Sequence, residues 1–159
     1  MTTYTATRAA STFPVAGGVG NAQSLKVAHG TIEISANPAP ADIFQMCRVP
    51  KGAVIVGGRV IADKLDSIGS GSALLDIDIG LNDAGTTDTD ALGNFGVWNG
   101  AAVAGTKPES GHNFPLGGLL ISAGPITTTG EAIVEAYVVA SAVAFATGTL
   151  SVTVDYYVP

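Results

Sequence analysis

The sequence predicts an all-β fold, a single antiparallel sandwich or barrel with an extended N-terminal arm. Short segments in which apolar and polar residues alternate recur along the chain, and glycine or proline separates them. Signals that start a helix are almost absent. The chain has 159 residues, 47% of them hydrophobic, which suffices for one domain with a buried core.

The first 22 residues predict the arm. They are rich in threonine, alanine and glycine, and they lack the periodicity of a helix or a strand. A glycine-rich run at 16–21 is typical of a flexible connector. We therefore expect an extended arm at 1–22, with a disordered tail as the alternative, in front of a β domain at 23–159.

The first strands of the domain are expected at 25–29, 31–35 and 43–49, where apolar residues alternate with polar ones. The prolines at 37–40 predict a loop between the second and the third. The single cysteine, Cys47, excludes an internal disulfide, and we expect a buried, unreactive thiol.

A long strand is expected at 53–62, with a bulge or bend at Gly57 and Gly58, because glycine inside a strand often marks one. A glycine- and serine-rich loop at 68–72 follows. The next strand, 75–81, alternates strictly. Its leucines and isoleucines are expected to point inward, and Asp76 and Asp78 outward.

Residues 82–115 form the longest stretch without strand character, and we interpret them as an insertion in the domain. A stretch of that length is usually functional or bound to a partner. Threonines and aspartates at 87–92 are compatible with the start of a short helix. Phe95 and Trp98 are expected to anchor this insertion against the chain's own core or against a neighbouring subunit.

The last strands are expected at 116–122, 126–129, 131–140 and 149–158. The alanine-rich continuation of the third of these, up to Ala146, is compatible with a helix.

Motifs for catalysis or for a resident metal are absent from the sequence. It contains no phosphate-binding loop, no nucleophile elbow and no zinc-ligand spacing. We expect no catalytic, cofactor-binding or metal-binding residues. A small hydrolase using His29 or His112 stays open as an alternative, since catalytic triads converge in space rather than in sequence.

Aspartates gather in the middle of the chain, and their oxygens are the ligands that calcium prefers. The members are Asp76, Asp78, Asp83, Asp88 and Asp90. Their spacing does not match an EF-hand loop, and aromatic residues, at 6%, are few for a sugar-binding cleft. A calcium- or sugar-binding sandwich module remains an alternative.

The net charge of −6 argues against general binding to nucleic acid, which needs a basic surface. The charge is uneven, because residues 1–60 carry a balance of +3 and residues 61–159 one of −9. The five basic residues of the first part are Arg8, Lys26, Arg48, Lys51 and Arg59. This asymmetry is compatible with chance scatter of charges over a solvated surface or with docking of the N-terminal part on an acidic partner.

Membrane association is not expected. The N-terminal residues lack an apolar leader segment. The longest apolar stretch, 132–146, is interrupted by Glu135 and Ser141 and is shorter than the ~20 residues of a membrane-spanning helix. We expect synthesis and folding in a reducing cytoplasm.

Four segments resemble the decoration, or cement, proteins of tailed-bacteriophage capsids. They are the arm at 2–6, VPKGAVIVGGRVIAD at 49–63, LLDIDIGLND at 74–83 and GTLSVTVDYYVP at 148–159. The resemblance covers residues 23–159 and consists of patterns rather than invariant residues. It implies a jelly-roll-like sandwich, a homotrimer, and a place on the outer surface of the virion. It also implies the major capsid protein as partner, production in the cytoplasm of a bacterial host, and no enzymatic activity.

Other virion components, such as a head fibre, a tail protein or a minor capsid protein, remain alternatives. The residues that we expect to contact the capsid or a neighbouring subunit are Tyr4, Arg8, Phe13, Lys26, Arg48, Lys51, Phe95 and Trp98.

Overall fold

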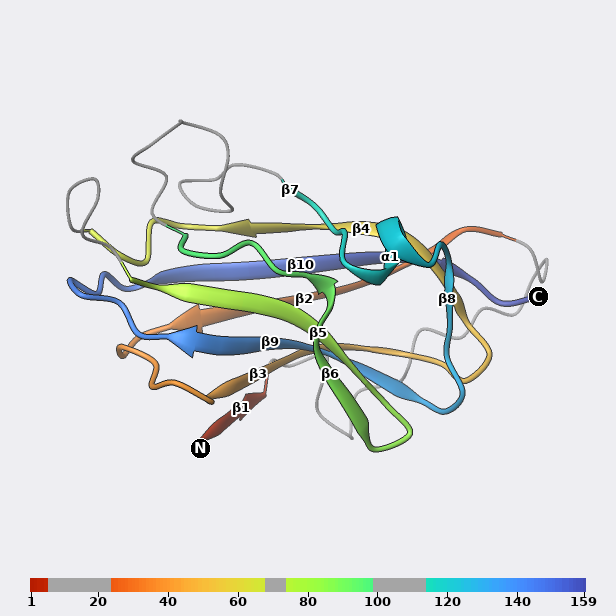
Figure 1. Ribbon diagram of the computed structural model, residues 1–159, viewed down its shortest axis with the longest axis horizontal. Coiled ribbons are helices and arrows are strands. Elements are labelled where there is room, and N and C mark those ends of the chain that lie inside the picture. Colours follow the sequence, from red (N-terminus) through yellow and green to blue (C-terminus); the bar gives the residue numbers. More distant parts are fainter. Residues whose placement is uncertain (6–23, 68–73, 99–113) are drawn as a thin grey trace.

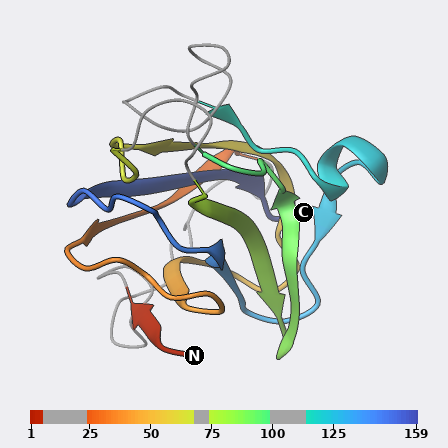
Figure 2. The same ribbon diagram turned by 60° about the vertical axis from the view of Figure 1, so that its left-hand side comes forward.

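The computed structural model describes residues 1–5, 24–67, 74–98 and 114–159, which form two β-sheets packed face to face (Figures 1 and 2). The longer strands are β2 (Lys26–Ile34), β3 (Ile43–Val49), β4 (Val54–Ala62), β5 (Asp76–Asp83), β6 (Thr86–Gly93), β9 (Ala132–Ala140) and β10 (Gly148–Tyr157). Three short strands, β1 (Thr3–Thr5), β7 (Phe114–Pro115) and β8 (Ile126–Thr127), and the one-turn helix α1 (Leu119–Ser122) complete the described elements.

The strand order is that of a jelly roll. One sheet, the β9 sheet, has the order β1-β3-β9-β5-β6. The other, the β10 sheet, has the order β2-β10-β4-β7, with β8 also paired to β4. Successive strands cross repeatedly from one sheet to the other, as in two interlocked Greek keys. The parallel pair β1–β3 is the exception in a set of otherwise antiparallel described pairs. The predicted antiparallel, jelly-roll-like sandwich is confirmed.

The core lies between the two sheets and follows the predicted alternation. In β10, Leu150, Val152, Val154 and Tyr156 are all fully buried, and the residues between them are half-buried. The thiol of Cys47 is buried, as expected. Burial of alternate residues from both sheets removes apolar surface from water, which is the main stabilising contribution in such a fold.

The two sheets approach each other closely at the edge formed by β2 and β3. Gly30 of β2 faces the backbone of Met46 in β3, so that a Cβ atom at position 30 would lie 2.0 Å from the Met46 carbonyl oxygen. The register of β3 against β9 shifts between Gln45 and Cys47, at this same point. Glycine is needed here because no side chain fits between the two backbones.

The glycine pair in β4 lies at an irregularity, as predicted. The register between β4 and β10 shifts between Asp155 and Tyr156, opposite Gly57 and Ile55. This register shift lies next to the two glycines, whose lack of a side chain lets the backbone depart from a regular strand.

The helix considered for 87–92 is wrong, because these residues belong to β6, which pairs with β5 as a hairpin. The turn consists of Ala84 and Gly85, which both have positive φ angles (52° and 84°), the geometry of a type I′ turn. The stretch without strand character is consequently shorter than 82–115, since β5 extends to Asp83 and β6 covers 86–93.

Two further expectations are corrected. The strand at 116–122 is instead a turn followed by α1, because Gly118 has a φ of +57° and so interrupts an extended backbone. The helical continuation to Ala146 is also wrong, because β9 ends at Ala140 and the chain then becomes irregular. That segment is held by Asp66, which is buried and accepts hydrogen bonds from the backbone N–H groups of Val143 (3.0 Å) and Ala144 (3.1 Å).

Candidate functional site

The residues predicted to make intermolecular contacts lie in separate parts of the molecule. Arg8 and Phe13 fall outside the described residues. Tyr4 lies on β1, Lys26 and Lys51 lie at one end of the sandwich, and Phe95 and Trp98 follow β6. The structure therefore offers several candidate interaction surfaces rather than one pocket lined by all of them.

The first surface is the outer edge of β3, where β1 pairs over Ile43, Phe44 and Gln45. We call Asp42–Gln45 the acceptor edge. Its carboxylate, Asp42, is 3% exposed and accepts hydrogen bonds from the backbone N–H groups of Thr2 (2.8 Å) and Ala39 (3.0 Å).

Tyr4 holds β1 on the acceptor edge by stacking on Phe44, with ring centroids 5.0 Å apart. Tyr4 itself remains 39% exposed, whereas Phe44 is buried. A hollow of about 40 Å³ lies between these rings and residues 33–36 at the end of β2. An aromatic ring with one exposed side, beside a hollow, suits contact with another chain.

The second surface is the end of the sandwich where β2 and β4 begin and β10 finishes. Lys26 pairs with Tyr156 and Val54 with Tyr157, so Lys26 and Lys51, just before β4, lie at the same end. We call this end the lysine end. Two exposed apolar residues flank Lys26, namely Leu25 (64% exposed) and Val27 (53% exposed). Arg48, by contrast, forms an ion pair with Glu131, the residue just before β9.

Trp98 is an anchor of the chain's own core. It is 1% exposed, its indole N–H donates a 2.8 Å hydrogen bond to the carbonyl of Ile77, and Phe95 packs edge-on against its ring. This geometry supports packing against the chain's own core, the first of the two roles expected for Trp98. The ring is buried within one copy, so Trp98 is not part of an exposed surface of the described residues.

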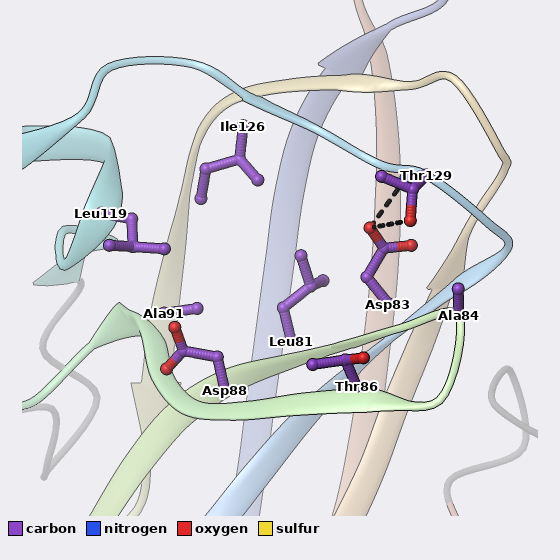
Figure 3. A pocket seen from close by; sticks show the side chains of 9 residues that line it. All are labelled: Leu81, Asp83, Ala84, Thr86, Asp88, Ala91, Leu119, Ile126 and Thr129. Carbon is purple, nitrogen blue, oxygen red and sulfur yellow. Dashed lines mark hydrogen bonds between the residues drawn. The ribbon is translucent and has the colours of Figure 1, made fainter.

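A groove lies between the β5–β6 hairpin and the segment from α1 to β8 (Figure 3). Its volume is about 340 Å³. The apolar part of its lining comprises Leu81, Ala84, Ala91, Leu119 and Ile126, and the polar part Asp83, Thr86, Asp88 and Thr129. The sequence does not reveal this groove, because two of its walls, 86–93 and 119–122, adopt conformations other than those that the local pattern predicts.

Asp83 joins the end of β5 to the turn after β8. Its carboxylate accepts hydrogen bonds from the Thr129 backbone N–H (2.7 Å), the Thr129 hydroxyl (2.9 Å) and the Gly130 N–H (2.8 Å). Burial raises the pKa of Asp83, but these hydrogen bonds outweigh it, so the pKa lies below its ordinary value. The carboxylate is thus ionised and structural.

Asp78 does not point into solvent as expected, since it is only 5% exposed. The end of β6 and the chain after it cover this part of β5, and the Phe95 N–H donates a hydrogen bond to the carboxylate. Burial, with the nearby charges of Asp76 and Asp90, raises the pKa of Asp78 to about 6. Among the described residues, no three His, Cys, Asp or Glu side chains are placed to share a metal ion.

Replacing Asp78 with asparagine is expected to stabilise the protein at pH 8 and to leave its stability unchanged at pH 4. The folded-state pKa, about 6, exceeds the ordinary 3.8, so the stability that Asp78 contributes is present at low pH and is lost as pH rises through 6. Urea unfolding at both pH values should give a gain on the order of 2 kcal/mol at pH 8. The control Asp83→Asn should lower stability at pH 8, and a gain for both variants would contradict the assignment.

His29 lies on the exposed outer face of the β10 sheet. Its Nε2 is 2.9 Å from the Thr31 hydroxyl, which is 2.9 Å from the Ser151 hydroxyl. His112 falls outside the described residues. Within the part of the chain that the structure describes, no helix is long and apolar enough to span a membrane.

Comparisons with known proteins identify the fold among phage capsids. A chain of the capsid asymmetric unit of cyanophage Pam1 aligns with a TM-score of 0.68 and 26% identity, over 94% of this chain and 95% of that one. A chain of the capsid of Ralstonia phage GP4 aligns with a TM-score of 0.69 and 18% sequence identity, over 99% of this chain and 98% of that one. A chain of the acid-stable capsid of Helicobacter pylori bacteriophage KHP30 aligns with a TM-score of 0.59 and 15% sequence identity, over 86% of this chain and 90% of that one. No family model and no curated protein matches the sequence.

Proposed function

We propose that this chain is a structural protein of a phage virion, and more specifically a decoration protein that binds the outer surface of the capsid and stabilises it. The supporting observation is the similarity to the chain from the Pam1 capsid, at 26% identity over nearly the full length of both. Such coverage means that the Pam1 chain is about as long as this one. In that capsid, therefore, the fold occurs as a chain of its own.

The physical properties of the chain suit this role. Only 13% of its residues are charged, and 21 are glycines, so its surfaces can pack closely against other subunits. Decoration proteins act in many copies, and modest contacts multiply when several copies are linked in one oligomer. We propose a homotrimer, with the major capsid protein as partner, located on the virion and made in the host cytoplasm. The proposed role is mechanical and involves no catalysis.

The lysine end is the surface that we propose to face the shell. Lys26 and Lys51 provide positive charge, and Leu25 and Val27 provide exposed apolar surface next to it. This combination fits an acidic partner with an apolar patch, because complementary charges guide docking and apolar burial supplies affinity. Tyr4, Arg8, Phe13 and Phe95 remain proposed contact residues, while Arg48 already has Glu131 as a partner.

The test is co-sedimentation of the purified protein with capsid shells of its source phage, with native mass spectrometry of the free protein. We expect saturable binding, a trimeric free form and a higher melting temperature of the decorated shell, since a ligand of the assembled state stabilises it. The double substitution Lys26→Glu and Lys51→Glu should weaken binding by about tenfold or more.

Lys64→Glu is the matched control for these substitutions. Lys64 is exposed, like Lys51, but it follows the other end of β4. Its charge reversal should leave binding unchanged. Equal loss of binding for Lys64→Glu would contradict the lysine end as the docking surface.

A monomer that does not bind shells would overturn the decoration role and favour a tail or head-fibre component. Heat released on titration with calcium or glycans would favour the binding-module alternative.

A further inference from the structure

We propose that β1 is exchanged between copies of this chain, so that β1 of one copy pairs with the acceptor edge of a second copy. The inference concerns how copies are joined and does not depend on binding to a shell. It is based on three features: an acceptor edge that belongs to the folded body, a donor strand with few contacts of its own, and a long connector between the two.

The acceptor edge is in place whether or not β1 occupies it. On its other side β3 pairs with β9 along its whole length, from Ile43 opposite Tyr137 to Val49 opposite Ala132. Asp42 is fixed from within the body by the Ala39 N–H. Without a donor strand, the outer side of β3 would present unpaired backbone groups, which is the usual template for pairing with another chain.

The donor strand is bound by few contacts. It comprises three residues, all exposed, and the side-chain contacts that it makes with the described body include the Tyr4–Phe44 stack and a 3.3 Å hydrogen bond from Thr5 to Gln45. The backbone contacts include those of Thr2 with Asp42 and with Ile43. At about 1 kcal/mol for each such contact, releasing β1 requires much less free energy than unfolding the body.

The connector is much longer than a folded-back arm requires. The 20 residues from 6 to 25 separate β1 from β2. The path from Gln45 to the end of β3 is ~13 Å, and packed sheets are ~10 Å apart, so a span of roughly 25 Å suffices within one copy. Fully extended, 20 residues reach ~66 Å, which is far enough to reach an adjacent copy.

The same contacts are made in both arrangements, so the balance between them depends on concentration. A tether of 20 residues gives β1 an effective concentration on the order of millimolar at its own acceptor edge. Neighbouring copies in an oligomer or on a lattice are present at comparable local concentration, and exchange then costs little. The result is a set of subunits in which each holds its neighbour by a strand.

The experiment uses two single variants, Thr5→Cys and Gln45→Cys, because these side chains contact each other across β1 and β3. The variants are coexpressed, concentrated to ~1 mM so that intermolecular pairing competes with the tethered arm, and mildly oxidised. We expect a disulfide-linked heterodimer, identified by mass spectrometry of the linked peptides. The native Cys47 is buried, so we expect it to form no disulfide that would compete with the engineered one.

The double variant, with both substitutions in one chain, reports pairing within a copy in dilute solution, and we expect it to close internally there. The control pair combines Thr5→Cys with Thr153→Cys, on the outer face of the β10 sheet, and should give no specific heterodimer. Absence of the Thr5–Gln45 heterodimer at ~1 mM would overturn the proposal, whether or not the double variant closes. Because no shells are present, this result is independent of the capsid experiment.

Discussion

Replacing Gly30 with alanine is expected to prevent folding or to lower the free energy of unfolding by more than ~3 kcal/mol. The added Cβ would lie 2.0 Å from the carbonyl oxygen and 2.4 Å from the carbonyl carbon of Met46. Neither partner is a flexible side-chain end, so the two sheets would have to separate at the β2–β3 edge. Far-UV circular dichroism and urea unfolding would measure the effect.

Gly57→Ala is the matched control, because Gly57 also lies in a long strand of the β10 sheet. A Cβ there would find its nearest atom, an Asp155 carboxylate oxygen, at 4.0 Å. We expect a change within ~1 kcal/mol, since the space is open and alanine reduces the entropy of the unfolded chain. Equal destabilisation by both substitutions would show that the effect at Gly30 comes from β-strand propensity rather than from the close approach of the sheets.

Replacing Trp98 with alanine is expected to cost about 3–5 kcal/mol of stability. The indole ring is 1% exposed, and its loss would open a cavity beside β5 and leave the Ile77 carbonyl without its side-chain donor. Tryptophan fluorescence is lost with the ring, so circular dichroism in urea is the appropriate measurement.

Two further variants separate the contributions of Trp98. Trp98→Phe keeps most of the apolar volume but removes the hydrogen bond, so a smaller loss of about 1–2 kcal/mol is expected. Val97→Ala alters the adjacent residue, which is 39% exposed, and should change stability by less than ~0.5 kcal/mol. A small effect of Trp98→Ala would mean that the insertion is not anchored at this ring.

The prediction of the fold succeeded where local pattern decides the structure. Strand β10 alternates strictly between buried and half-buried residues, and its bounds differ from the expected 149–158 by one residue at each end. It failed where the structure depends on a single turn, or on a segment distant in the sequence that covers a strand. The Ala84–Gly85 turn converts 86–93 into a strand, because it returns the chain onto β5, and helix-like capping signals there had no bearing on that.

Asp78 illustrates the second kind of failure. Its neighbours in the sequence indicate an outward-facing residue on a half-exposed strand, and this would be right for a bare sheet. The chain returns over that face after β6, which no local pattern reveals. Local sequence patterns do not predict the acceptor edge or the groove either. Both are formed by residues about 40 positions apart, such as Thr2 with Asp42 and Asp83 with Thr129.

The pairing of β2 with β10 has a consequence for biosynthesis. The first strand of the sandwich body finds its hydrogen-bonding partner in the last, from Lys26 opposite Tyr156 to Ile34 opposite Gly148. The β10 sheet can therefore close only after residues 148–157 have left the ribosome, and until then β2 lacks its described strand partner. Closure of so long a loop is slow, and the nascent chain passes through a stage prone to aggregation. The topology thus makes closure of the β10 sheet a late step in folding.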